Sequence, residues 1–195
     1  MGTTKLITYE DSLTMPENRL EEIVHGESRT MPPVTFYHAC LIRMLSKILE
    51  AQLQPREYSL FGGDVGLGIE RSPLTCRIPD LMVFRMESLR RERAQAAVGD
   101  PYIWTAPDLL VECLSPSNRR GAVRELLADY QHIAVPEVWL LDPALALFVS
   151  YRYESGALRE AQTVSNGRVT PVLLPEATVE LADLWAAFDG TSLGL

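Results

Sequence analysis

Apolar residues recur at helical spacing in two segments of the chain, which predicts two amphipathic helices. The first segment runs from Phe36 to about Leu53 and is stopped by Pro55; its apolar stripe consists of Leu41, Met44, Leu45, Ile48 and Leu49. The second runs from Arg119 to Ile133, and its stripe consists of Val123, Leu126, Leu127 and Tyr130. An apolar stripe has to be buried against another element, so both helices are expected to flank a sheet.

Short apolar or alternating segments predict the strands of that sheet. VGLGIE alternates Val65, Leu67 and Ile69 as a half-buried strand does, whereas IPDLMVF and PDLLVECL are compact apolar runs typical of central strands. The arginine-rich stretch between these two runs is expected to lie outside the core. PEVWLLD, ALFVSYRY and ALREAQTV follow as strands, with SNG at 165–167 predicted as a hairpin turn.

The ends of the chain are less regular. LEEIVHGE fits either a short strand or a helix end that closes on Gly26, and VELADLWAAF predicts a short final helix. The order of elements indicates an α/β fold with a mixed β-sheet flanked by helices. A chain of 195 residues fits a single domain, 1–195.

The charge balance narrows the range of functions. There are 18 Lys and Arg against 26 Asp and Glu, a formal net charge of −8, which argues against a protein that coats nucleic acid without selectivity. A local basic groove remains compatible with this balance. Its positive charge would come from arginine, because the only lysines are Lys5 and Lys47.

Hydropathy and cysteine usage indicate a cytoplasmic protein without membrane contact. No apolar run approaches the ~20 residues that a membrane-spanning helix needs, and the polar start MGTTKLITYEDS does not resemble a signal peptide. Cys40, Cys76 and Cys113 are odd in number and far apart, which favours free buried thiols over disulfides or a zinc site.

Two acidic residues stand in segments where burial should exclude them. Asp80 opens PDLMVF, and Glu112 lies in the middle of PDLLVECL. Two carboxylates from neighbouring strands can hold Mg²⁺, which prefers hard oxygen ligands and keeps several waters. The structural alternative is that Asp80 caps its strand and that Glu112 pairs with Arg119 or Arg120; the spacing alone leaves both open.

Two further polar residues are weaker candidates. Asp108 lies four residues before Glu112, so at ~3.3 Å per residue their side chains stand about 13 Å apart, too far to share one metal. Asp108 is therefore expected to have a structural role at the end of the strand. His38, at the start of the first helix, could lie near the metal site or be a surface or capping residue.

Several segments, in this order, resemble the Uma-type restriction endonuclease family of the PD-(D/E)XK nuclease superfamily. They are LEEIVHGE with the MPP and histidine that follow it, RIPDLMVF, APDLLVECLSPSNRR, Y…AVPEVWLLDP and VSYRY, and the likeness spans about Thr8 to Leu184. The resemblance implies a restriction-endonuclease-like core and hydrolysis of DNA by water activated at a two-carboxylate Mg²⁺ site, with Mn²⁺ as a substitute. Relatives of this kind often pair, so a homodimer is expected.

The resemblance also assigns expected roles to individual residues. Asp80 resembles the motif aspartate and Glu112 the motif acid, and these two are the expected metal ligands. Glu22 resembles the acidic residue of the N-terminal element that often joins such a site. A bound metal would explain why Glu112 is tolerated in an apolar strand.

The chain departs from the family pattern at the catalytic lysine. The superfamily places a lysine two residues after the acid, where this chain has Leu114, and the Uma-type relatives supply it four residues before a tyrosine, where this chain has Leu126. Ala122 stands where relatives often have an aspartate. Arg124 or Arg120 could substitute as a positive charge, although Arg124 should point away from the stripe that contains Leu126.

Three functions are compatible with these observations. The first is a Mg²⁺-dependent deoxyribonuclease in which Asp80, Glu112, Glu22 and Arg124 form the site. The second is a catalytically degenerate relative that binds nucleic acid without cutting it, or acts as an interaction module. The third is a structural protein in which the two carboxylates are salt-bridged. A positive group within reach of the metal site would favour the first over the second.

Overall fold

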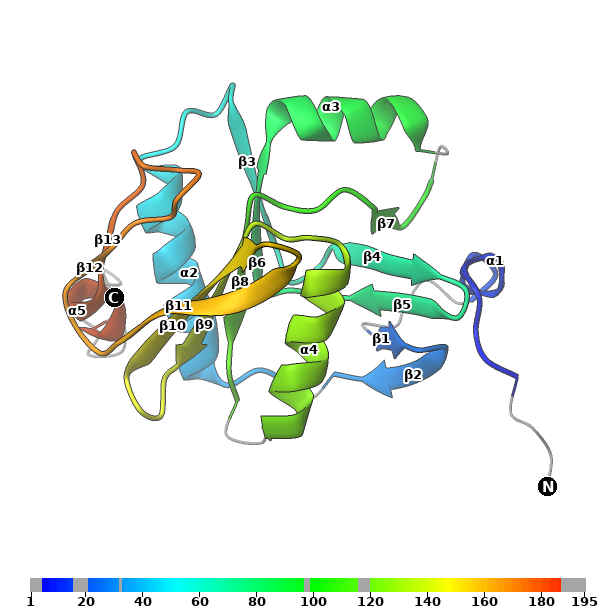
Figure 1. The fold of residues 1–195 in the computed structure, drawn as a ribbon, viewed down its shortest axis with the longest axis horizontal. Coiled ribbons are helices and arrows are strands. Elements are labelled where there is room, and N and C mark those ends of the chain that lie inside the picture. Colours follow the sequence, from blue (N-terminus) through cyan, green and yellow to red (C-terminus); the bar gives the residue numbers. More distant parts are fainter. Residues whose placement is uncertain (1–4, 16–20, 32, 97–98, 116–119, 187–195) are drawn as a thin grey trace.

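A mixed sheet forms the centre of the computed structural model (Figure 1), which describes residues 5–15, 21–31, 33–96, 99–115 and 120–186. Within these ranges six strands have the order β11-β10-β9-β8-β6-β3. Their bounds are β3 Tyr58–Gly62, β6 Leu81–Arg85, β8 Leu109–Cys113, β9 Glu137–Asp142, β10 Leu147–Glu154 and β11 Ala157–Val164. The β8–β9 pair is parallel and the other pairs are antiparallel.

A second, smaller sheet lies beside the first. Among the described residues its strand order is β2-β1-β5-β4-β7, with bounds β1 Glu21–Val24, β2 Glu27–Thr30, β4 Gly66–Arg71, β5 Leu74–Arg77 and β7 Tyr102–Ile103. A short ribbon pairs β12 Arg168–Val169 with β13 Val179–Glu180. The helices are α1 Tyr9–Ser12, α2 Phe36–Glu50, α3 Met86–Gln95, α4 Arg120–His132 and α5 Leu181–Trp185.

The two faces of the central sheet are buried by different helices. Odd-numbered residues of β6, β8 and β9, such as Val83, Val111 and Trp139, share a core cluster with α2. Even-numbered residues, such as Met82 and Leu110, share the second cluster with α4 and β4. Since side chains alternate across a strand, every even position of β8 is directed toward α4.

Several predictions are confirmed by these elements. The first amphipathic helix is α2, and the second is α4, whose apolar stripe packs against the sheet. The compact apolar runs form the central strands β6 and β8. Within LEEIVHGE, Glu21–Val24 form the strand β1, which pairs with β2 in a hairpin, so the strand alternative holds for the described residues. Arg119, predicted as the first residue of the second helix, lies outside the described residues. Cys40, Cys76 and Cys113 are free and buried, as expected.

One local prediction needs correction. SNG at 165–167 is not a hairpin turn, because the strands on either side of it, β11 and β12, belong to different sheets and do not pair. The hairpin in this region joins β10 and β11 at Ser155 and Gly156, which both have positive φ (51° and 85°). Consecutive positive φ values suit a two-residue hairpin turn, whereas Gly167 leads into β12, which pairs with β13.

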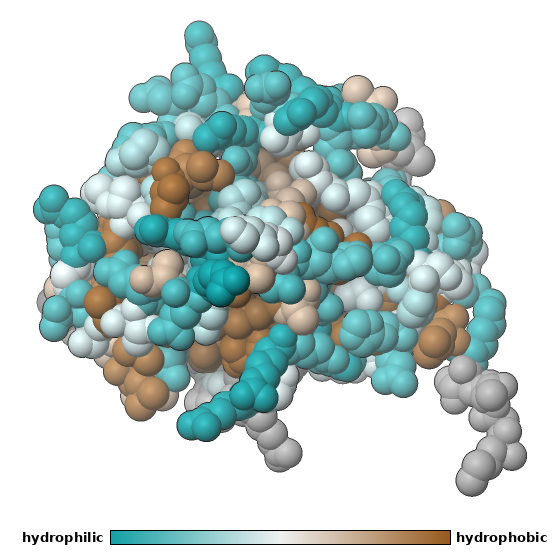
Figure 2. Space-filling view, viewed as in Figure 1, coloured by the Kyte–Doolittle hydropathy of each residue, from teal (hydrophilic) through white to brown (hydrophobic). Residues whose placement is uncertain are grey.

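The arginine-rich connection lies outside the core, as predicted, but it contains a helix, α3, that was not predicted. This helix has no buried residue, so it leaves no apolar stripe in the sequence, and the upper part of the surface where it lies is largely hydrophilic (Figure 2).

Trp104, the residue after β7, packs so closely on β4 that position 68 has to be glycine. A Cβ atom added at Gly68 would lie 2.4 Å from the Trp104 ring, whereas one added at Gly62 meets nothing within 4 Å. We expect Gly68→Ala to lower the free energy of unfolding by about 1–3 kcal/mol through overpacking. Urea denaturation checks this, with Gly62→Ala as the matched control, and equal effects of the two substitutions would contradict it.

No helix in the described residues is long and apolar enough to cross a membrane. The single domain, the cytoplasmic location and the homodimer remain predictions.

Candidate active site

A pocket of about 410 Å³ opens where the two sheets meet α2 and α4, and it contains all three acidic residues expected at the site. Glu22, Asp80 and Glu112 each line it. They come from β1, from the residue before β6 and from β8, so the tertiary structure brings together residues that are far apart in the sequence.

Strand pairing places Asp80 directly beside Glu112. Leu81 is paired with Val111 in the antiparallel β6–β8 ladder, and continuing this register by one residue puts Asp80 opposite Glu112. Side chains at opposed positions of an antiparallel pair lie on the same face, with Cβ atoms about 5 Å apart. The two carboxylates therefore face the same pocket from adjacent strands.

The Asp80 carboxylate is fixed on both sides. Its Oδ2 accepts a hydrogen bond from the backbone N–H of Cys113 at 2.7 Å, and its Oδ1 lies 2.8 Å from Nε2 of His38. The backbone N–H of His38 is bonded to the Thr35 side chain, which caps the N-terminus of α2. His38 is thus a neighbour of the carboxylate pair as well as a first-turn helix residue.

Glu112 makes no hydrogen bond or ion pair with an arginine in the part of the chain that the structure describes, although the positive charge of Arg77 acts to lower its pKa. The Tyr130 hydroxyl donates a hydrogen bond to its Oε1. Burial raises the pKa of Glu112 well above its ordinary value, the negative charge of Asp80 raises it further, and the Tyr130 hydrogen bond offsets part of this rise. Arg120, one proposed partner, is exposed at the start of α4, and Arg119 lies outside the described residues.

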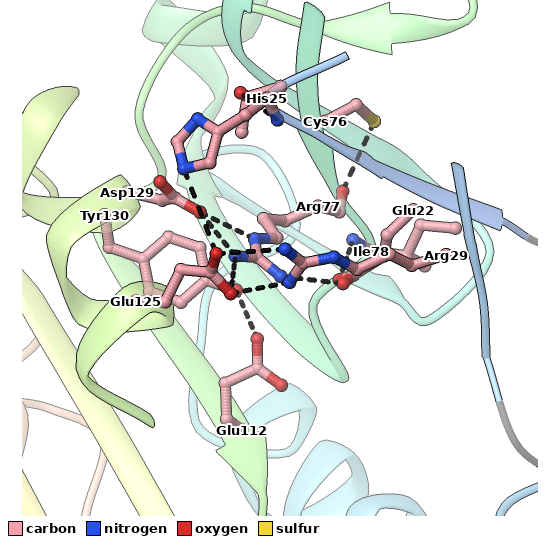
Figure 3. A network of polar contacts seen from close by, with 11 residues as sticks. Glu22, His25, Arg29, Cys76, Arg77, Ile78, Glu112, Glu125, Asp129 and Tyr130 are labelled. Atoms are coloured by element: carbon pink, nitrogen blue, oxygen red, sulfur yellow. Dashed lines mark hydrogen bonds and ion pairs between the residues drawn. The ribbon is translucent and has the colours of Figure 1, made fainter. Parts of the chain in front are cut away.

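Glu22 belongs to an ion-pair network with Arg77. Its Oε2 accepts a hydrogen bond from Nη1 of Arg77 at 2.9 Å, and its Oε1 accepts one from the backbone N–H of Ile78 at 3.1 Å. Nε of Arg77 donates to Oδ2 of Asp129 on α4 at 2.8 Å. Arg77 is only 4% exposed, so this network is a buried connection between β1, β5 and α4 (Figure 3).

Arg77 was not predicted as a site residue. It stands in LTCRIP, the only charged residue of an otherwise uncharged segment, three residues before Asp80. This isolated charge was the available signal, since a buried arginine has to find carboxylate partners.

The predicted role of Arg124 is not supported by its position. Arg124 is exposed on α4 and is not among the pocket-lining residues that the structure describes, whereas Leu114, Ala122 and Leu126 do line the pocket. Two residues along a helix correspond to a turn of about 200°, which directs Arg124 away from the wall that Leu126 forms. Leu114 and Leu126, which occupy the two positions expected for the family lysine, therefore form apolar parts of the pocket wall.

Asp108 has the structural role that its spacing predicted. It lies at the other end of β8, where its Oδ2 accepts a hydrogen bond from the backbone N–H of Arg85 at 2.8 Å.

The charges that line the pocket fit a divalent cation. The described lining contains four carboxylates and two guanidinium groups, Glu22, Asp80, Glu112, Glu125, Arg29 and Arg77, a net charge of −2 when all are ionised. No group of three or more His, Cys, Asp or Glu side chains in the described ranges is arranged to hold a metal. Two carboxylates with water as the remaining ligands suit Mg²⁺ rather than a metal that needs an all-protein cage.

Comparisons with known proteins agree with the motifs. The family model Uma2, described as "Putative restriction endonuclease", matches residues 8–183. The "Uncharacterized protein sll1609" of Synechocystis sp. is 31% identical over 143 residues, which make up 72% of this chain and 77% of that protein. A crystal structure of "a putative nuclease belonging to DUF820" from Anabaena variabilis has a TM-score of 0.76 at 21% identity, over 93% of this chain and 98% of that chain.

The match to the solved structure shows the fold of this chain, and the match to the family model shows which family it belongs to. The predicted α/β fold, a mixed sheet flanked by helices, is confirmed, and it is shared with the Anabaena protein. Because the family model covers residues 8–183, most of the chain, the chain belongs to the Uma2 family, whose description is "Putative restriction endonuclease".

Proposed function

We propose that this protein is a Mg²⁺-dependent endonuclease that hydrolyses DNA phosphodiester bonds, with Asp80 and Glu112 as the metal ligands and Mn²⁺ as a substitute ion. The observation that carries the proposal is the pair of adjacent carboxylates in one pocket, where the charge of Asp80 contributes to raising the pKa of Glu112. A divalent cation would relieve this repulsion, and family membership supports a nucleic-acid substrate.

The surrounding residues would hold the two ligands in place. The Cys113 N–H and His38 orient Asp80, and the Tyr130 hydroxyl orients Glu112. A bound Mg²⁺ would lower the pKa of a water and stabilise charge on the phosphate. Arg77 would contribute positive potential without exchanging protons, because a guanidinium holds its proton too firmly for acid–base chemistry.

Glu22 would act through Arg77. Its carboxylate is engaged by Nη1 of Arg77 and by the backbone N–H of Ile78, so its function in the proposed site is to position the arginine at the pocket wall. A homodimer, which would present one pocket to each DNA strand, is part of the same proposal.

Restoring the family lysine should increase the activity. Leu126 lines the pocket, so Leu126→Lys would bring an ammonium group toward the carboxylate pair. We expect Mg²⁺-dependent cleavage of supercoiled plasmid to rise about 10²-fold over the slow wild type, the size of effect that one electrostatic stabiliser usually provides. The rate is measured from plasmid nicking and linearisation.

Ala128→Lys is the matched control, since it adds the same charge on the exposed side of the same helix. An equal gain in both variants would mean that only net charge matters. If neither the wild type nor Leu126→Lys cleaves DNA with Mg²⁺ or Mn²⁺, the nuclease proposal fails.

A further inference from the structure

The carboxylate of Glu125 lies between two guanidinium groups at the exposed side of the pocket (Figure 3). Its Oε2 and Oε1 accept hydrogen bonds from Nη1 and Nη2 of Arg29 at 2.5 and 3.0 Å. Its Oε2 is also 3.6 Å from Nη2 of Arg77, and its Oε1 is 3.9 Å from Nε2 of His25. Two guanidinium groups and an imidazole around one carboxylate make an anion-binding position that the protein fills with its own side chain.

The Arg29–Glu125 contact has the geometry of an arginine–phosphate contact. Two parallel N–H groups of one guanidinium reach two oxygens of one anion, which is the arrangement that arginine also uses for phosphate. The hydrogen bonds from Arg29 hold the pKa of Glu125 below its ordinary value, so the pair is ionised at neutral pH. A phosphate could therefore take the place of the carboxylate with the same charge and the same donors.

The pair is exposed enough to exchange its partner. The side chains of Arg29 and Glu125 are 43% and 31% exposed, and they come from the edge strand β2 and from α4. A surface ion pair of this kind contributes little to the free energy of folding, so replacing the carboxylate by an outside anion costs little free energy.

Arg77 provides a second donor next to the same position. Its Nη2 is buried and lies 2.6 Å from Oδ2 of Asp129, yet it makes no well-directed hydrogen bond to any atom in the described ranges. Nη2 carries two N–H groups, so its contact with Asp129 leaves it able to donate to a second anion. An anion placed where the Glu125 carboxylate lies could accept from it.

We propose that Arg29 is a phosphate-binding residue of the nucleic-acid site and that Glu125 competes with the DNA backbone for it. The identity of the ligand as DNA rests on the proposed function, whereas the competition rests on the geometry of Arg29, Glu125 and Arg77. When DNA binds, a backbone phosphate replaces the Glu125 carboxylate at the Arg29 guanidinium, and the glutamate side chain turns out to solvent. Glu125 therefore weakens DNA binding in the wild type.

Fluorescence anisotropy of a short fluorescein-labelled DNA duplex tests this, with Ca²⁺ replacing Mg²⁺ to limit cleavage of the probe. Glu125→Gln should tighten binding about twofold to tenfold, and Arg29→Gln should weaken it by a similar factor. Arg29→Gln should also lower the slope of log Kd against log salt by about 0.9, the loss of one phosphate contact. In the Arg29→Gln background, Glu125→Gln should have little further effect.

Glu87→Gln is the matched control, because Glu87 is exposed on α3 and its loss changes the net charge equally. The inference is overturned if Glu87→Gln tightens DNA binding as much as Glu125→Gln does. It is also overturned if Glu125→Gln tightens binding by the same factor in the Arg29→Gln background as in the wild type, or if neither the wild type nor Glu125→Gln binds the duplex.

The plasmid assay separates this inference from the proposed nuclease activity. Binding that follows the expected pattern without cleavage would refute the nuclease activity alone, and cleavage with unchanged binding in Glu125→Gln would refute this inference alone.

Discussion

Replacing Glu112 by glutamine is expected to abolish Mg²⁺ and Mn²⁺ binding and to lower DNA cleavage by at least about 10²–10³-fold, the usual effect of losing a main electrostatic element of a site. Glutamine keeps the size of the side chain and can still accept the Tyr130 hydrogen bond, so the fold should be retained. Isothermal titration calorimetry of wild type, Glu112→Gln and Asp80→Ala with each metal measures the loss of binding.

The same substitution should change how stability depends on pH. The pKa of Glu112 is raised in the folded protein, mainly by burial and by Asp80, so its contribution to stability is fully present below the unfolded value of about 4.5 and is lost as pH rises through the folded pKa. Without metal, Glu112→Gln should therefore be as stable as the wild type or more stable at neutral pH. Between acidic and neutral pH its stability should fall less steeply, as measured by thermal melting in EDTA.

Two results would contradict this interpretation of Glu112. Unchanged metal binding in the variant would remove Glu112 from the ligand set. A marked loss of apo stability at neutral pH would show that the carboxylate acts as a structural partner, which is the alternative that the sequence left open.

Replacing Arg77 by methionine is expected to lower the free energy of unfolding by about 3–5 kcal/mol. Arg77 is 4% exposed and neutralises Glu22 and Asp129, so its removal leaves the buried Asp129 and the partly buried Glu22 without a counter-charge. Arg77→Lys should retain part of the stability, because an ammonium keeps the charge but cannot reach both carboxylates with the same fork of donors. Urea denaturation of the three proteins measures the order wild type, Arg77→Lys, Arg77→Met.

Arg168→Met provides the control for removing an arginine from an ion pair. Arg168 and Glu180 form an exposed pair across β12 and β13, with side chains 68% and 43% exposed, so its loss should cost no more than about 1 kcal/mol. If Arg77→Met were no more destabilising than Arg168→Met, the buried network would not be a source of stability. Arg77 would then be present for the chemistry of the pocket alone.

The sequence was informative wherever a side-chain pattern is local. The stripe of α4 and the apolar runs of β6 and β8 follow from periodicity, because spacing alone decides which side of an element is buried. The same logic identified Asp80 and Glu112, since a carboxylate inside an apolar strand is costly wherever the strand ends up. It failed for α3, which has no buried face, and for the turn at 165–167, whose residues suit several kinds of turn.

The contacts that the site residues make with distant residues could not be predicted from local sequence patterns. Arg77 contacts Asp129 and Glu22 across 52 and 55 residues of sequence, and periodicity does not say which distant segment covers a given face. For the same reason Tyr130 was expected only as part of an apolar stripe, although its hydroxyl reaches Glu112.

The sequence by itself determined the family and the α/β class. It also identified the two carboxylates of the site and showed that neither position expected for the family lysine carries a lysine. These conclusions depend only on residue identity and local pattern. Only the tertiary structure decided that Asp80 stands opposite Glu112, that Arg77 rather than Arg124 reaches the pocket, and that Glu125 engages Arg29. Strand register and helix docking set these contacts, and both arise from the packing of whole elements rather than from any single segment.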